Sequence, residues 1–227
     1  MKPRLLLKTQ WPIIALLFVS ALFVLFPQLD LISGGWFYDP ETKRFPLLGQ
    51  PVVEIPYDWV PLIGRGILIL LLLTFALSFR PIWRHWRKTT LFLFFCLLVG
   101  PGLIVNALFK ENWARARPYE VTQFNGAMQF TRAWQITDQC PYNCSFVSGH
   151  ASAAFVLMAP AFLFVGWRRK TWFAIGLGMG AYIGWVRMAQ GGHFLSDVIL
   201  AGFAVYFGCK LVYWLMYQMP WRRDKSN

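Results

Sequence analysis

Long apolar runs recur along the whole chain, separated by short basic segments or by longer mixed ones. Six of these runs approach the length of about 20 mostly apolar residues that a helix needs to cross a bilayer. They occupy residues 11–29, 62–79, 90–108, 150–167, 172–190 and 194–217. The pattern therefore predicts an all-α polytopic membrane protein with six transmembrane helices, folded as one domain over residues 1–227.

The composition excludes the other broad classes. Hydrophobic residues make up 57% of the chain and charged residues only 14%, whereas charged residues are about 25% of a soluble domain. A soluble domain of this length cannot bury so much apolar surface, and a disordered chain has the opposite composition. The net charge of +12 would suggest nucleic acid in a soluble protein. Because no basic soluble domain is present to carry that function, no nucleic-acid partner is expected.

The distribution of charges predicts the orientation in the membrane. Thirteen cations fall on one side of the six predicted helices, in segments 2–8, 80–88, 168–170 and 222–225, together with one acid, Asp224. The other side carries eight cations and the remaining nine acids. Since basic loops stay in the cytoplasm, both termini are expected to be cytoplasmic.

Two long segments, residues 30–61 and 109–149, are predicted as loops on the outer side. Long loops in a compact protein are usually functional. The second loop holds Cys140 and Cys144, spaced C-x3-C. A zinc site would need two more ligands at suitable spacing, which the loop lacks. Outside the cytoplasm a local disulfide that fixes the turn before Ser148 is the preferred interpretation.

The clearest chemical pattern is Arg187-x5-His193-x3-Asp197, at the outer ends of two predicted helices. On a helix, His193 and Asp197 would share one face. The carboxylate can then accept the imidazole Nδ1–H and leave Nε2 as a nucleophile or base. Two glycines at positions 191 and 192 permit a tight turn that brings Arg187 beside His193. The alternative is a His–Asp pair that only closes a helix turn.

Two further groups lie on the same side. Lys110-x6-Arg117 follows the third predicted helix and offers a point charge and a planar fork, the two usual phosphate binders. Ser148-Gly149-His150 begins the fourth, where a capping serine and free N–H groups can bind an anion and the histidine can donate a proton. Taken singly, each group also fits a structural role, as cations on lipid headgroups or as a helix cap.

Together the three groups fit a tetrahedral phosphate dianion. They supply three cations, a helix N-terminus, two imidazoles and an orienting carboxylate on one side of the membrane. A nitrogen nucleophile on one side of phosphorus and a proton donor on the other allow phosphoryl transfer by positioning and charge neutralisation. No carboxylate cluster suited to magnesium accompanies them, so we expect neither a metal nor a cofactor.

At these residues the sequence resembles the type 2 phosphatidic acid phosphatase superfamily, whose signature is K-x6-R-P, P-S-G-H and S-R-x5-H-x3-D. The chain matches it with Lys110, Arg117 and Pro118, then Ser148, Gly149 and His150, then Arg187, His193 and Asp197. Val147 replaces the usual proline, and Val186 replaces a serine that would add a hydroxyl to the phosphate site. The resemblance implies a membrane lipid phosphatase, because the six predicted helices argue against the soluble haloperoxidases of the superfamily.

The resemblance also implies a role for each residue. His193 would attack phosphorus and form a phosphohistidine, and Asp197 would orient it. His150 would protonate the leaving oxygen and later help water attack the phosphoenzyme. The phosphate oxygens would be bound by Lys110, Arg117, Ser148, Gly149 and Arg187.

Residues 134–148 are similar to the same segment of bacterial lipid A phosphatases, so lipid A is the preferred substrate. The similarity implies a bacterial inner-membrane protein whose site faces the periplasm, with no obligatory protein partner. Phosphatidic acid, phosphatidylglycerol phosphate and undecaprenyl diphosphate stay open as substrates, as does transfer of the phosphate to a lipid acceptor. A transporter or structural protein would need polar groups near mid-membrane, whereas here they gather at one interface.

Overall fold

The computed structural model describes residues 3–219, with side chains described from Gln10 onward. The cations at positions 2 and 222–225 and Asp224 therefore lie outside the described residues. The helices are α1 Pro3–Leu25, α2 Gln28–Gly35, α3 Pro51–Leu77, η1 Pro81–Trp86, α4 Arg87–Leu97, η2 Leu98–Lys110, α5 Glu111–Trp113, η3 Pro118–Glu120, η4 Thr122–Phe124, α6 Gly149–Phe155, η5 Val156–Leu163, α7 Gly166–Ala189, α8 Leu195–Tyr213 and η6 Trp214–Gln218. Within residues 3–219 no strand is formed, which confirms the all-α class.

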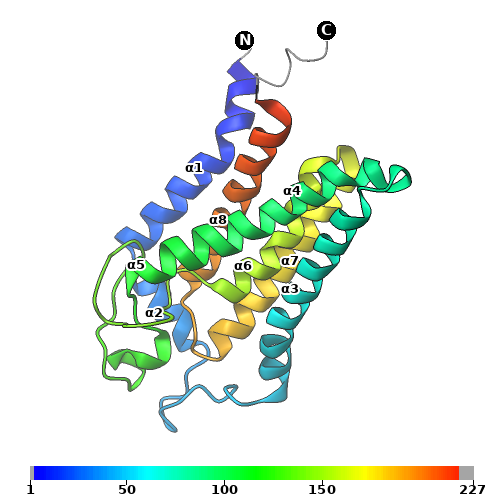
Figure 1. Cartoon of the computed structure of the whole chain (residues 1–227). Helices are drawn as coiled ribbons and strands as arrows, with labels where there is room; N and C mark the ends of the chain where they lie inside the picture. Colours follow the sequence, from blue (N-terminus) through cyan, green and yellow to red (C-terminus); the bar gives the residue numbers. More distant parts are fainter. Residues whose placement is uncertain (1–2, 220–227) are drawn as a thin grey trace.

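Helix α8 is the central element of the bundle, in contact with α1, α2, α4, α6 and α7. Small residues allow these helices to pack closely against α8. At Gly184 in α7, an added Cβ would lie 2.2 Å from a methyl carbon of Val198 in α8. Figure 1 shows that α2 and the long segments between helices gather at one end of the bundle, opposite the end where α1 begins. The sequence predicted this gathering of the long segments.

Three helical stretches are long and apolar enough to cross a membrane: Pro51–Leu77, Pro81–Glu120 and Leu195–Gln218. The pair Gln10–Leu25 and Gln28–Gly35 makes a fourth if it counts as one bent span. The predicted fourth span is the shorter helix Gly149–Leu163. The predicted fifth is α7, whose mean hydropathy is reduced by its glycines and by Arg168, Arg169 and Lys170. The six-span topology therefore stays a prediction.

The first predicted span is wrong at its outer end. We expected one helix over residues 11–29, but α1 stops at Leu25 and α2 leaves it at an angle of 83°. Pro27 stands at the break, and a proline there cannot donate the backbone hydrogen bond that would continue α1. The bend carries Asp30 sideways toward the start of α8.

The first outer loop is also shorter than predicted. We expected a loop over residues 30–61, but α2 occupies its beginning and α3 starts at Pro51, eleven residues before the predicted span at 62. Pro51 stands at the start of α3, where a missing N–H costs least, while Pro56 and Pro61 lie inside the helix. Glu54 and Tyr57 are consequently held on a helix.

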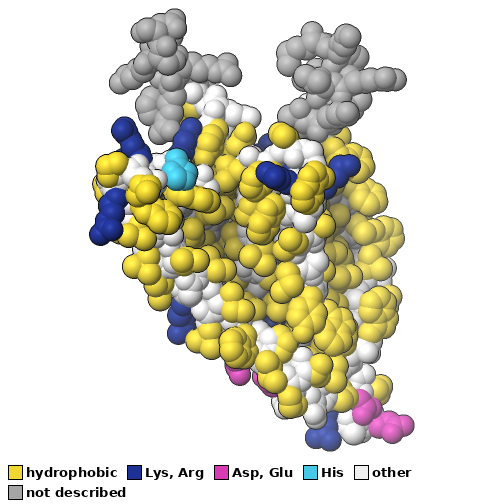
Figure 2. Space-filling view, turned by 90° about the vertical axis from the view of Figure 1, so that its right-hand side faces the viewer, with side chains coloured by type: hydrophobic (Ala, Val, Ile, Leu, Met, Phe, Trp, Pro, Cys, Tyr) yellow, Lys and Arg dark blue, Asp and Glu magenta, His cyan; other side chains and the backbone are white. Residues whose placement is uncertain are grey.

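The surface is apolar around the middle of the bundle. In Figure 2 hydrophobic side chains cover the middle of the visible face, Lys and Arg gather toward the end where α1 begins, and Asp and Glu appear only at the opposite end. Residues such as Leu70 and Leu73 of α3 are more than half exposed. Soluble proteins rarely expose an apolar surface of this extent, so the surface fits contact with lipid chains.

Candidate active site

The loop between α7 and α8 holds the first half of the site. Gly191, with φ at +67°, closes the end of α7, a conformation that glycine adopts without strain. His193 follows and is only 1% exposed, while Asp197 lies in the first turn of α8. His193 Nδ1 lies 3.8 Å from Asp197 Oδ2. The nearest Asp197 oxygen thus faces Nδ1, which leaves Nε2 on the far edge of the imidazole ring.

Ser145 stands between these two groups, which the sequence did not predict. Its hydroxyl donates to Asp197 Oδ2 at 2.5 Å and lies 3.5 Å from His193 Nδ1. The same carboxylate oxygen accepts the backbone N–H of Phe194 at 2.9 Å. At 3.8 Å the His193–Asp197 contact is longer than a hydrogen bond, as catalytic contacts often are without substrate.

The protonation state of His193 suits a nucleophile. Burial lowers the pKa of His193 to about 3, with the neighbouring carboxylate of Asp197 acting in the opposite direction and the cation of Arg187 adding to the decrease. The imidazole is therefore neutral at pH 7, because the pH lies well above that pKa. A neutral imidazole keeps a free lone pair on one nitrogen.

The start of α6 lies directly against the start of α8. The backbone N–H of Ser148 donates to the carbonyl of Asp197 at 3.1 Å, and the Ser148 side chain accepts from the N–H of Ala151 at 3.4 Å. Ser148 is therefore an N-cap, and its side chain is fully buried. His150 follows on the first turn, and its buried Nε2 has no hydrogen-bond partner in the described structure. An orphaned buried nitrogen at this place fits a proton donor awaiting substrate.

Tyr57 of α3 joins His150 to Arg187. The Tyr57 ring stacks on the His150 ring with centroids 4.5 Å apart, and the Arg187 guanidinium lies 4.6 Å from the Tyr57 centroid. Arg187 also donates to Gln190 Oε1, and Gln190 Nε2 donates to Glu54 at 2.8 Å. Arg187 Nε is buried without a partner among the described residues. Gln190 thus holds the guanidinium from one side, and the Nε–H of Arg187 is left to donate to a ligand.

The two cations of the first motif meet at Asn143. Lys110 Nζ donates to Asn143 Oδ1 at 2.7 Å, and Arg117 donates to the Asn143 carbonyl at 2.6 and 3.2 Å. Lys110 Nζ also lies 3.4 Å from the position that a Cβ on Gly149 would occupy. The first and second motifs are therefore in contact, and a side chain at position 149 would crowd the lysine.

The structure brings the predicted site residues together through a closed series of contacts. Lys110 touches Gly149, Ser148 bonds to Asp197, and His150 is joined through Tyr57 to Arg187. The guanidinium of Arg187 in turn folds over Gly192, where an added Cβ would lie 2.3 Å from Nη2, beside His193. Within residues 3–219 no group of three His, Cys, Asp or Glu side chains is arranged to hold a metal ion.

Sequence reasoning missed several residues of this site. Glu54 and Tyr57 were assigned to a loop, Asn143 and Ser145 carry no distinctive spacing, and Arg115 was counted as one more loop cation. Asp30 was placed at the start of the first outer loop and given no role. Signals did exist for two of them, since Arg115 lies within the Lys110–Arg117 motif and Ser145 stands between the paired cysteines and Ser148.

The structure joins Cys140 and Cys144 in a disulfide, with their Cα atoms 5.6 Å apart. Cys96 and Cys209 are free and buried in the core. The Cys140–Cys144 loop carries Asn143, which contacts both Lys110 and Arg117, so the bond restrains the loop that holds these two cations. Mass spectrometry of the unreduced protein should find the peptide about 2 Da lighter than its dithiol form. Two free thiols in protein purified without reductant would contradict this pairing.

Comparison with known proteins agrees with the motifs. The PAP2 superfamily profile matches residues 89–224. A lipid A 4'-phosphatase of Francisella tularensis subsp. novicida is 38% identical over 205 residues, which is 88% of this chain and 92% of the relative. Lipid A 4'-phosphatases of Rhizobium leguminosarum and Rhizobium etli are 39% and 36% identical over about half of this chain and 45% and 40% of their own lengths. No solved structure matches the chain. The resemblance found in the sequence is confirmed, and the chain belongs to the PAP2 superfamily.

Proposed function

We propose that this protein is an integral-membrane phosphatase that removes the 4'-phosphate of lipid A through a phosphohistidine on His193. The observation that carries the chemistry is the convergence of Lys110, Arg117 and Arg187 around a buried, neutral His193. The relatives named above support the choice of lipid, since the match to the Francisella enzyme covers 92% of its length. The first chemical step is a phosphoryl transfer between the lipid oxygen and an imidazole nitrogen.

In the first half-reaction His193 Nε2 attacks phosphorus while the bond from phosphorus to the lipid oxygen breaks. His150, which takes up a proton when the phosphate dianion offsets the neighbouring cations, gives that proton to the oxygen, so the lipid leaves as a neutral alcohol. The cations neutralise the charge that spreads over the phosphate oxygens. Asp197 stabilises the positive charge that His193 gains when it is phosphorylated.

In the second half-reaction water attacks the phosphohistidine. Neutral His150 accepts a proton from that water, the bond from nitrogen to phosphorus breaks, and inorganic phosphate leaves. His193 then returns to its neutral state, and His150 is again protonated. His150 thus gives one proton to the lipid oxygen and regains one from water. The cycle consumes only the lipid phosphate and water.

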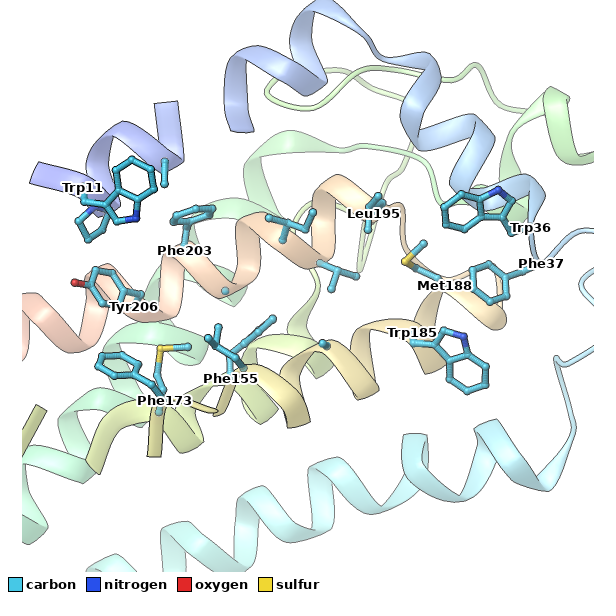
Figure 3. Close-up of a pocket in the computed structure, with 18 residues that line it drawn as sticks. Trp11, Trp36, Phe37, Phe155, Phe173, Trp185, Met188, Leu195, Phe203 and Tyr206 are labelled. Atoms are coloured by element: carbon cyan, nitrogen blue, oxygen red, sulfur yellow. The ribbon is translucent and has the colours of Figure 1, made fainter. Parts of the chain in front are cut away.

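An apolar cavity beside the site supports a lipid substrate. It has a volume of about 790 Å³ and is lined by side chains of α1, α6, η5, α7 and α8. Figure 3 shows Leu195 and Met188 at one end of this cavity and Trp11, Phe173 and Tyr206 toward the other. From Leu195 to Tyr206, α8 rises about 16 Å, close to half of a hydrocarbon core of about 30 Å. An acyl chain placed here would begin two residues from His193.

The proposed function is tested by phosphate release from pure lipids in detergent. We expect the purified protein to release phosphate fastest from lipid A, with loss of the 4'-phosphate and retention of the 1-phosphate. Phosphatidic acid, phosphatidylglycerol phosphate and undecaprenyl diphosphate serve as the comparison substrates. A clear preference for any of these three would overturn the assignment of lipid A. Release of free phosphate without an added acceptor also separates a hydrolase from a phosphotransferase.

Metal chelation should leave the activity intact, while vanadate should inhibit it. The reason is that the protein cations are placed to neutralise the phosphate, and that vanadate can adopt the five-coordinate geometry of the transferring group. The measurement is the initial rate in EDTA and in increasing vanadate. An absolute requirement for magnesium would contradict the assignment of Lys110, Arg117 and Arg187 as the phosphate-binding cations.

We further propose six membrane spans in a bacterial inner membrane, with both termini in the cytoplasm and the site facing the periplasm. The apolar helices and the separation of cations from acids support this orientation. A membrane-impermeant maleimide should label Glu41→Cys in intact cells but label Arg169→Cys only after the inner membrane is opened. Labelling of Arg169→Cys in intact cells would contradict the orientation.

A further inference from the structure

Arg115 is the most deeply buried cation of the described chain. Its side chain is completely inaccessible, and so are those of the two acids that it bridges. Arg115 Nη1 donates to Asp197 Oδ1 at 2.6 Å, Nη2 donates to Asp30 Oδ2 at 2.8 Å, and Nε donates to the Thr131 carbonyl at 2.9 Å. The guanidinium thus links a catalytic carboxylate to an acid of α2.

Asp30 is fixed at the far end of this bridge by the start of α8. Its Oδ1 accepts the backbone N–H of Ser196 at 2.8 Å, and its Oδ2 accepts the Ser196 hydroxyl at 2.6 Å. The N–H of Ser196 is one of the helix-start donors that have no partner within the helix. The bend after Pro27 is what allows α2 to present Asp30 at this point. Asp30 therefore binds both Arg115 and the turn that carries Asp197.

The charges of this group are not balanced within it. One cation and two acids are buried together, and burying a charge without a full partner is costly. A single acid would have satisfied Arg115. Burial raises the pKa of Asp30, and the cation and hydrogen bond of Arg115 act against that rise, so Arg115 is the group that keeps this second acid ionised. Because Arg115 pairs with both carboxylates, it neutralises Asp197 only in part. Asp197 can therefore still stabilise positive charge on His193.

We propose that Arg115 and Asp30 are positioning residues for the phosphohistidine chemistry, an inference that rests on the proposed function. Arg115 holds Oδ1 of Asp197, so that Oδ2 stays turned toward His193 Nδ1. Asp30 anchors Arg115 and competes with Asp197 for its positive charge. Neither residue touches the phosphate, which is bound by Lys110, Arg117 and Arg187 instead.

Removing the charge of Asp30 should therefore impair the chemical step and spare substrate binding. In Asp30→Asn, Arg115 has only Asp197 as its counter-charge and draws more of it away from the cationic, phosphorylated His193. We expect kcat to fall about 10- to 100-fold, the usual size of effects from residues that orient a catalytic ligand. KM and the inhibition constant of inorganic phosphate should stay at their wild-type values.

Vanadate distinguishes positioning from a loss of folded protein. Vanadate imitates the transferring group bound to His193, so its inhibition constant should weaken by the same factor as kcat. If Asp30→Asn only reduced the folded fraction, Vmax would fall while the inhibition constants of vanadate and phosphate both stayed unchanged. Asp39→Asn is the matched control, because Asp39 binds only Glu41, Thr42 and Arg44 within its own loop.

Ser196→Ala provides a second variant that keeps all three charges. It removes the hydroxyl that accepts from Arg115 at 2.9 Å and donates to Asp30. It should lower kcat and weaken vanadate inhibition, each by a smaller factor than Asp30→Asn does. An active wild-type enzyme whose variants keep the wild-type vanadate inhibition constant would overturn the inference alone. A wild-type protein without phosphatase activity on any of the lipids would instead overturn the proposed function.

Discussion

Replacing His193 by alanine should abolish phosphate release from every substrate and prevent formation of a phosphoenzyme. The nucleophile is then absent, and the remaining groups can bind phosphate without providing an acceptor atom for it. Losses of about 10⁴- to 10⁶-fold are typical when a covalent nucleophile is removed. The measurement is a single-turnover assay with a lipid that carries a radioactive phosphate, followed by quantification of the labelled protein.

Two control variants separate chemistry from folding. His193→Gln fills most of the buried volume and should be equally inactive, although it can still donate a hydrogen bond. His85→Ala removes the third histidine of the chain, which is exposed in η1 near the opposite end of the bundle, and should keep wild-type activity. A His193→Ala protein that still accepted the label would contradict the assignment of the nucleophile.

The effect of His150→Ala should depend on the leaving group. An alkoxide leaves poorly without a proton, and general acid catalysis contributes about 10²- to 10⁴-fold. A nitrophenolate leaves readily and needs little protonation. We therefore expect His150→Ala to slow dephosphorylation of lipid A by about two to four orders of magnitude and to slow phosphorylation by an aryl phosphate much less.

The same variant should accumulate phosphoenzyme when an aryl phosphate is the donor. Attack of water on phosphohistidine also needs a base, and the Nε2 that would serve has no other partner in the described structure. The burst of nitrophenol and the lifetime of the labelled protein measure the two half-reactions separately. Equal losses on both substrates, together with no accumulation of phosphoenzyme, would show that His150 is not the acid and base.

The ordered motifs explain why so much of the site could be predicted from the sequence. Spacing brings His193 and Asp197 near each other, although His193 lies in the loop just before α8 and not on the helix, and the glycines before His193 indicate the turn that the structure contains. The turn between α7 and α8 is local, so its residues carry the necessary information. The N-cap position of Ser148 was predictable for the same reason.

The missed residues depend on contacts between distant segments. Tyr57 stacks on His150 only because α3 begins early, and its prolines concealed that start. Arg115 and Asp30 are charged residues with no local sign of burial, and their pairing requires the bend after Pro27. Hydropathy alone also does not establish α7 as a span, because this helix packs closely through small residues such as Gly184 and is less apolar than the other long helices.

In the proposed mechanism the phosphate of lipid A passes through His193. The most direct test is to mix the enzyme with lipid A radiolabelled at the 4'-phosphate, stop the reaction within one turnover, and map the labelled peptide by mass spectrometry. We expect a transient phosphate on His193 that forms before free phosphate appears and disappears as free phosphate accumulates. Release of free phosphate with no labelled residue at any time, or a label on a residue other than His193, would contradict it.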